Sequence, residues 1–174
     1  MQLGEVYAKK EDFGQSKQYL MEVISDEQKN GSDKYTGKAY HYLANNYMAL
    51  EEYDTAIDLF NKPSSYNSST TGKFISYLDR GDCYLRMGEN EKALASLQKA
   101  VMLYQSVSPN PEYAEVFNLL AKAYLQKGNT QSMATSFTSY GDELKNFLQQ
   151  KEENIQLLNK QRFEQLVNSR ATLK

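Results

Sequence analysis

One fourteen-residue pattern occurs four times in this chain, and it constrains the fold more than any other feature. The copies are YAKKEDFGQSKQYL at 7–20, YMALEEYDTAIDLF at 47–60, YLRMGENEKALASL at 84–97 and YLQKGNTQSMATSF at 124–137. Successive copies begin 40, 37 and 40 residues apart. Self-similarity at this kind of period indicates a stacked repeat architecture, in which each unit packs against its neighbours.

Four places in the pattern keep their character from copy to copy. The first is always Tyr, and the place four residues later is Glu or Gly, where a turn is expected. The place nine residues after the Tyr is small in three of four copies, and the place thirteen residues after it is Leu or Phe. These places hold Tyr7, Tyr47, Tyr84 and Tyr124; Glu11, Glu51, Gly88 and Gly128; Ser16, Ala56, Ala93 and Met133; and Leu20, Phe60, Leu97 and Phe137.

The spacing of apolar residues predicts two helices in each copy. Before the turn of the second copy, apolar residues recur at i, i+3, i+4 and i+7, which is one face of a helix. They are Tyr40, Leu43, Ala44 and Tyr47, and the same spacing resumes after the turn with Ala56, Ile57 and Phe60. Each copy is therefore interpreted as two antiparallel helices joined by a short turn.

Small residues are expected where the two helices of a copy approach each other. Ala44, Gly81 and Ala121 occupy this place in the first helices, and Ala56 and Ala93 occupy the matching place in the second helices. A single helical hairpin cannot cover its own apolar face, so neighbouring hairpins are expected to stack and share a core.

This pattern resembles the tetratricopeptide repeat, whose order is Tyr/Phe–x–x–Leu–Gly/Ala–x–x–Tyr followed by Ala–x–x–x–Phe. Copy two matches six of the eight usual signature places, with Tyr40, Leu43, Ala44, Tyr47, Ala56 and Phe60. The intervals exceed the 34 residues usual for this repeat. The surplus is assigned to loops at 25–37, 61–72 and 106–113, and to longer helices. Such lengthened repeats resemble those of bacterial regulatory tetratricopeptide proteins.

The resemblance implies an all-α fold: a right-handed superhelix of about four antiparallel helix pairs with a long C-terminal helix. It covers residues 1–150, with copies near 1–30, 37–66, 74–106 and 114–148. Residues 151–174 are interpreted as a separate capping or linker helix. The first copy begins its pattern at Leu3, so its helix is expected to start before Met1. We interpret the chain as a fragment with further repeats or another domain upstream; a short first helix is the alternative.

The last stretch, residues 141–174, is rich in strong helix formers and contains no proline. We expect Leu144, Phe147 and Leu148 to cover the end of the stack. Beyond them runs a sparse apolar stripe of Ile155, Leu158, Leu166 and Leu173, and Lys151 and Arg162 interrupt any heptad pattern. Two interpretations stay open. The helix is a solvated cap, or it leads to a downstream domain or pairs with a second chain as a homodimer.

The charge balance excludes several classes of partner. The chain has 20 Lys and Arg residues against 22 Asp and Glu residues. A dedicated binder of nucleic acid or of anionic membranes would carry an excess of positive charge. No apolar run approaches the roughly 18 residues that span a bilayer, so membrane insertion is not expected. The compartment stays open: the cytoplasm is favoured, and a periplasmic part of a membrane-anchored regulator is the alternative.

The sequence contains little that indicates catalysis, so we expect a protein that is not an enzyme and that needs no cofactor or metal. His41 is the only histidine, and it is expected on the exposed groove side of its helix, as a surface residue. Cys83 is the only cysteine, and it is expected to be buried and inert. The segment SSTTGKF at 68–74 lacks the residues that a phosphate-binding loop requires.

The family resemblance also implies a binding groove, because the first helices of stacked tetratricopeptide hairpins line a concave surface. Its groove positions correspond here to Lys9, Lys38, His41, Asn45, Met48, Asp82, Arg86, Asn118 and Lys122, together with Glu5, Leu78, Leu85 and Leu125. Asn45 and Asn118 are the strongest candidates, because an amide can pair with both the N–H and the C=O of an extended peptide.

Two hypotheses about function follow. In the first, the chain is a non-catalytic module that binds a protein or peptide in its concave groove, as the sensor or scaffold part of a bacterial regulator. In the second, the array is a structural spacer, and the C-terminal helix dimerises or relays a signal to another domain. Binding to chaperone C-termini is not expected, because His41 stands where that class of groove has Lys.

Overall fold

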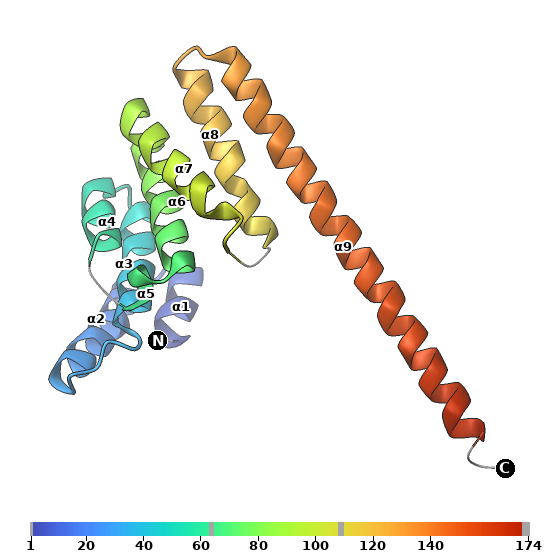
Figure 1. Ribbon diagram of the computed structural model, residues 1–174. Helices are drawn as coiled ribbons and strands as arrows, with labels where there is room; N and C mark the ends of the chain where they lie inside the picture. Colours follow the sequence, from blue (N-terminus) through green and yellow to red (C-terminus); the bar gives the residue numbers. More distant parts are fainter. Residues whose placement is uncertain (1, 63–64, 108–109, 172–174) are drawn as a thin grey trace.

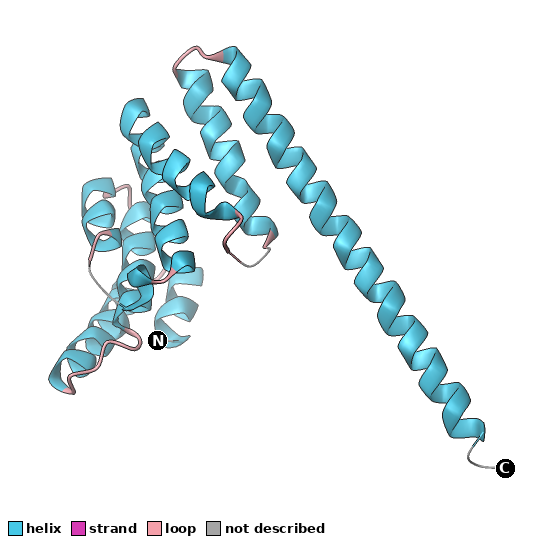
Figure 2. Ribbon diagram, in the orientation of Figure 1, coloured by secondary structure: helices cyan, strands magenta, loops and turns pink. Residues whose placement is uncertain are grey.

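The computed structural model describes residues 2–62, 65–107 and 110–171, with backbone alone at 65, 111, 159 and 162–171. Helices form four successive antiparallel pairs, and no strand occurs within those described ranges (Figures 1 and 2). The pairs are α1 (Gln2–Lys9) with α2 (Phe13–Lys29), α3 (Thr36–Ala49) with α4 (Tyr53–Phe60), α6 (Thr70–Arg86) with α7 (Asn90–Tyr104), and α8 (Glu115–Gln126) with α9 (Thr130–Ala171). The predicted all-α repeat fold is confirmed.

The four turns inside the pairs have one geometry. In each, the residue four places after the signature Tyr has a positive φ: 60° at Glu11, 63° at Glu51 and 76° at both Gly88 and Gly128. The next residue donates its N–H back to the carbonyl of the Tyr, at 2.8–2.9 Å in all four turns. This hydrogen bond and the left-handed residue define the Schellman motif that ends a helix. The repeated fourteen-residue pattern therefore encodes a repeated turn.

Close approach of the paired helices accounts for the small residues. A Cβ added at Gly81 would lie 2.5 Å from Cγ of Leu97 on the partner helix, and a Cβ at Gly4 would lie 2.8 Å from Cγ of Leu20. Both leucines are fully buried. Ala44 is likewise fully buried. The first and second helices therefore come close enough that larger side chains would not fit.

The core continues from one pair to the next. One cluster joins α2 to α3, a second joins α3 and α4 to α6, and a third fills the space among α6, α7 and α8. Cys83 of α6 lies in the second cluster, so it belongs to the junction between the second and third pairs. This continuity is how hairpins that cannot fold alone stabilise one another.

Two of the expected loops contain short helical segments. The segment between α4 and α6 includes α5 (Ser65–Ser68), and the segment before α8 includes the 3₁₀ helix η1 (Pro111–Ala114). The amide of Asn67 donates to the carbonyls of Phe60 and Lys62, which fastens α5 to the end of α4. Gly72 is required here, because a Cβ at that residue would lie 1.9 Å from the carbonyl oxygen of Tyr66.

The last helix, α9, differs from all others in length. It is continuous over 42 residues, or about 63 Å, so no break separates residues 1–150 from the tail. Its first half packs on α8, and the remainder extends away from the stack (Figure 1). Leu144 and Phe147 are half-buried, whereas Leu148 is 65% exposed, contrary to the expectation that it covers the stack. Ile155 and Leu158 are also exposed; Arg162, Leu166 and Leu173 lie outside the described side chains.

Candidate functional site

A hollow of about 500 Å³ opens between α1 and α3 on the face formed by the first helices. The charged groups in its wall are Glu5, Lys9 and Glu11, and the amides are those of Asn45 and Asn46. The apolar part of the wall comes from Ala8, Phe13, Tyr42 and Ala49. We call this site the α1–α3 hollow. Three of the residues predicted for the groove, Glu5, Lys9 and Asn45, meet here.

Two sets of contacts position the polar side chains of this site. The hydroxyl of Tyr42 interacts with the nearby carboxylate of Glu5, and partial burial together with this carboxylate raises the pKa of Tyr42 to about 12. The tyrosine therefore keeps its proton and remains a hydrogen-bond donor at neutral pH. Asn46 is buried and donates to the hydroxyl of Ser16, which donates in turn to the carbonyl of Gly4. This buried chain of hydrogen bonds holds α1, α2 and α3 in register.

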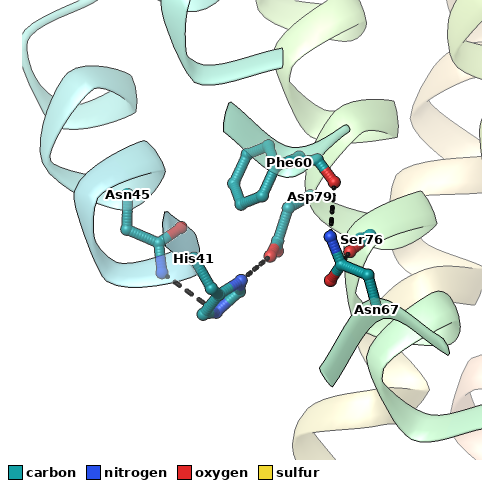
Figure 3. Close-up of polar contacts among 6 residues, drawn as sticks. All are labelled: His41, Asn45, Phe60, Asn67, Ser76 and Asp79. Carbon is teal, nitrogen blue, oxygen red and sulfur yellow. Dashed lines mark hydrogen bonds and ion pairs between the residues drawn. The ribbon is translucent and has the colours of Figure 1, made fainter. Parts of the chain in front are cut away.

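His41 lies beside the hollow and faces α6 instead of solvent, which corrects the expectation of an exposed surface residue. Its side chain is only 16% exposed, and its Nδ1 lies 3.4 Å from Oδ2 of Asp79 (Figure 3). Nε2 of the same ring lies 3.2 Å from the amide nitrogen of Asn45. The ring also packs against Phe60 and Tyr66, with centroid distances of 5.5 and 5.9 Å. The physical reason is that Phe60 of α4, Tyr66 of α5 and Asp79 of α6 together cover this side of α3.

Burial sets the protonation of the pair formed by His41 and Asp79. It lowers the pKa of His41 to about 4. It also raises the pKa of Asp79 to about 7, and the nearby Asp82 carboxylate adds to that rise. Both shifts disfavour the charged forms, so the pair is largely uncharged in moderately acidic solution. His41 and Asp79 thus join the second and third repeats through a titratable contact.

The remaining predicted groove residues lie on α3, α6 and α8. Lys38 is exposed, and Met48 is half-buried against the core cluster between α3 and α6. Asp82 accepts a hydrogen bond from Nε of Arg86 at 3.1 Å, so these two residues pair with each other. On α8, Glu115 accepts from the amide of Asn118 at 2.8 Å and lies 3.8 Å from the ammonium of Lys122. Both Asn45 and Asn118 thus have partners within the chain.

Besides His41, two predicted groove residues were placed wrongly, and several contributors were missed, among them Tyr42, Phe13 and Asp79. Leu78 and Leu85 are buried in the core among α6, α7 and α8, because this face of α6 is covered by its neighbours. Leu125 is exposed, as a surface position requires. Tyr42 and Asp79 were not predicted, although both stand five residues before a signature Tyr. This common position relative to the signature Tyr is the sequence signal that could have identified both residues.

No group of three or more His, Cys, Asp or Glu within the described ranges has the spacing of a metal site. Cys83 is fully buried, as expected. Burial and the carboxylates of Asp79 and Asp82 raise the pKa of its thiol to about 12, so it carries no reactive thiolate at neutral pH.

Family comparison agrees with the repeat geometry. Family models described as tetratricopeptide repeat match residues 1–25 and 73–132. These ranges include the first, third and fourth of the Schellman turns described above. The chain is a tetratricopeptide repeat protein. Such repeats serve as protein-interaction scaffolds, so this is a protein-interaction fold. No curated protein matches the chain.

Solved structures show the same fold at low sequence identity. The crystal structure of BtubC (BKLC) from P. vanneervenii is 14% identical, with a TM-score of 0.69, and the match covers 83% of this chain and 61% of that one. The solved structure of MamA MSR-1 C2 is 21% identical, with a TM-score of 0.60, and the match covers 83% of this chain and 74% of that one. A further MamA crystal structure is 18% identical, with a TM-score of 0.52, and the match covers 86% of this chain and 92% of that one. The tetratricopeptide chain thus spans less than two thirds of BtubC.

Among the described residues, none of the helices combines the length and the apolar character needed to cross a bilayer.

Proposed function

We propose that this tetratricopeptide protein binds an extended segment of a protein partner in the α1–α3 hollow, as the scaffold or sensor part of a bacterial regulatory protein. The observation that carries the proposal is the composition of the hollow. Charged groups of both signs and amides surround an apolar surface that includes Phe13 and Tyr42. Specific binding sites combine an apolar surface with a few placed polar groups in this way.

The polar groups of the hollow suit a peptide backbone. Asn45 offers an amide that can both donate and accept, and Tyr42 offers a hydroxyl near the carboxylate of Glu5. Lys9 and Glu5 stand one turn apart on α1, so they can pair with side chains of either charge. The buried bond between Asn46 and Ser16 keeps the wall rigid, which reduces the entropic cost of binding.

The test begins with selection of binding peptides from a random phage-displayed library on the purified chain. Affinities are then measured by calorimetry for the parent, Asn45→Ala and Lys9→Glu, with Lys10→Glu as the matched control on the adjacent exposed residue. Loss of one backbone-directed hydrogen bond at Asn45 should weaken binding by about 3- to 10-fold. Equal affinity of all four proteins would contradict the proposal.

The second candidate function rests on the exposed half of α9. Ile155, Leu157 and Leu158 are each more than half exposed, although they are apolar. In this alternative the array is a spacer, and α9 pairs with a second copy or leads to another domain. Light scattering after size exclusion, with and without residues 151–174, distinguishes the two functions. A dimer that becomes a monomer on truncation would favour α9 as the functional element.

A further inference from the structure

A second cavity, of about 230 Å³, lies where the end of α7 and the 3₁₀ helix η1 meet α9. We call it the α7–α9 pocket. Three aromatic rings line it, those of Tyr104, Tyr113 and Phe147, together with the carboxylate of Glu143. It shares no lining residue with the α1–α3 hollow. The groove positions implied by the family resemblance do not include any of its residues.

The α9 wall of the pocket follows from helical spacing. Glu143, Asn146, Phe147 and Gln150 stand at i, i+3, i+4 and i+7, so they share one face of the helix. This face is offered to α7 and η1 because the first half of α9 packs along α8. A carboxylate, an aromatic ring and two amides are therefore presented together from a single rigid element.

The opposite wall is held by packing in the core. The ring of Tyr113 packs on Phe74 with a centroid distance of 4.8 Å, and the ring of Tyr104 packs on Phe117 at 5.0 Å. Phe74 is fully buried, so these rings rest on a fixed base. The pocket is consequently preorganised, and filling it requires little rearrangement of its aromatic walls.

The carboxylate of Glu143 has unused capacity. The hydroxyl of Tyr104 donates to its Oε2 at 3.2 Å. Partial burial and this carboxylate raise the pKa of Tyr104 to about 12, so the hydroxyl stays protonated and keeps donating. A carboxylate has about four acceptor positions, and this contact occupies one. Within the described side chains, no Lys, Arg or His lies within ion-pair distance of Glu143 or lines the pocket.

We propose that the α7–α9 pocket binds an arginine side chain of a protein partner. Aromatic faces attract cations, and a guanidinium can stack on a ring while it pairs with a carboxylate. The amide oxygens of Asn146 and Gln150 can accept its further N–H groups, whereas that of Asn110 already accepts from the N–H of Glu112 at 3.0 Å. An anion would be repelled by Glu143. An uncharged apolar group would cover this carboxylate and leave the Tyr104 hydroxyl as its only partner among the described side chains, which is costly for a charged group.

The test uses Nα-acetyl-arginine amide as the probe, because its only charge is on the guanidinium. Titrations into the full ¹⁵N-labelled chain are followed by NMR, with the citrulline analogue as a neutral control of the same shape. Chemical-shift changes should map to α9 near residues 143–150 and to η1. The citrulline analogue should bind at least about tenfold more weakly, since it lacks the charge-assisted pair.

Two variants examine the walls separately. Glu143→Gln keeps the side-chain size and an acceptor for Tyr104, and should weaken binding of the arginine probe by about tenfold. Phe147→Leu should weaken it by about three- to tenfold through loss of the ring. Glu152→Gln on the exposed part of α9 is the matched control, and it should bind as the parent does. Melting curves for each variant verify that it is folded.

Several results would overturn the proposal. They are equal affinity for the arginine and citrulline probes, unchanged binding by Glu143→Gln, and shift changes that lie away from the pocket. Tighter binding of Nα-acetyl-lysine amide than of the arginine probe would also contradict the preference for a guanidinium. Asn45→Ala should leave binding of the arginine probe unchanged, so failure at this pocket is distinguishable from failure at the α1–α3 hollow.

Discussion

The four Schellman turns lead to a prediction that the chain is well suited to test. Two turns place glycine at the left-handed position and two place glutamate there, at otherwise matching hydrogen-bond geometry. A residue with a Cβ is disfavoured in this conformation by about 1–2 kcal/mol. The left-handed conformation of Glu51 should therefore lower the stability of the protein, whereas that of Gly88 should not. Replacing Glu51 with glycine should stabilise the protein.

The magnitude follows from two opposing terms. Glu51→Gly removes the free-energy cost of placing a residue with a Cβ in the left-handed conformation. It also gives the unfolded chain more conformational entropy, which lowers the free energy of unfolding by about 0.4–1 kcal/mol. We expect a net stabilisation of about 0.5–1 kcal/mol. Gly88→Ala should lower stability by a similar amount, and its cost is conformational alone, because a Cβ at Gly88 would have no atom within 4 Å. Glu52→Gly is the matched control: its φ is −84°, so it should only destabilise.

Urea unfolding followed by circular dichroism measures these changes. Repeat proteins can depart from two-state behaviour, so the midpoints are compared only where the slopes agree. The expected order of midpoints is Glu51→Gly above the parent, and Gly88→Ala and Glu52→Gly below it. If Glu51→Gly were destabilising while Gly88→Ala was neutral, the left-handed turns would not be features of the folded protein.

Three further predictions concern the core. Gly81→Ala should lower the free energy of unfolding by about 1–2 kcal/mol, because the cost of overpacking against Leu97 exceeds the gain in helix propensity. In urea unfolding, the double variant Gly81→Ala with Leu97→Ala should lose less stability than the sum of the two single variants. Lowering the pH from about 6.5 to 4 stabilises the fold through Asp79, whose pKa is raised, and destabilises it through His41, whose pKa is lowered. Asp79→Asn should therefore lose stability on acidification relative to the parent, and His41→Gln should gain it; parallel pH profiles would contradict this pairing. Cys83 should resist a thiol reagent at pH 8 until the protein unfolds, and rapid labelling of the native protein would show that the junction around it is open.

Local features of the structure could be predicted from the sequence because they repeat. Tyr47 and Glu51 gave the position of a turn, since the same spacing recurs in every copy. Gly81 and Ala44 indicated close helix approach, because few other reasons place such small residues at the same site. These inferences needed only the helical period and the size of side chains.

Contacts between repeats could not be predicted in the same way. His41 of α3 contacts Asp79 of α6, which belongs to the next hairpin. The relative rotation of successive hairpins that allows this contact is not encoded in the helical period of either helix. Leu78 looked equivalent to a groove residue by alignment, yet it is buried because α6 is covered on that side. The α7–α9 pocket was missed for a related reason. Its walls are brought together by η1, inside a segment interpreted as a loop.

Hydrogen–deuterium exchange on the full chain, with and without the selected peptide, tests the central claim most directly. The claim is that the face of the first helices binds the partner. We predict slower exchange in α1 and α3, at residues 2–9 and 36–49, with unchanged exchange beyond residue 150. Protection confined to the exposed half of α9, with none in α1 or α3, would contradict the claim and favour α9 as the binding element.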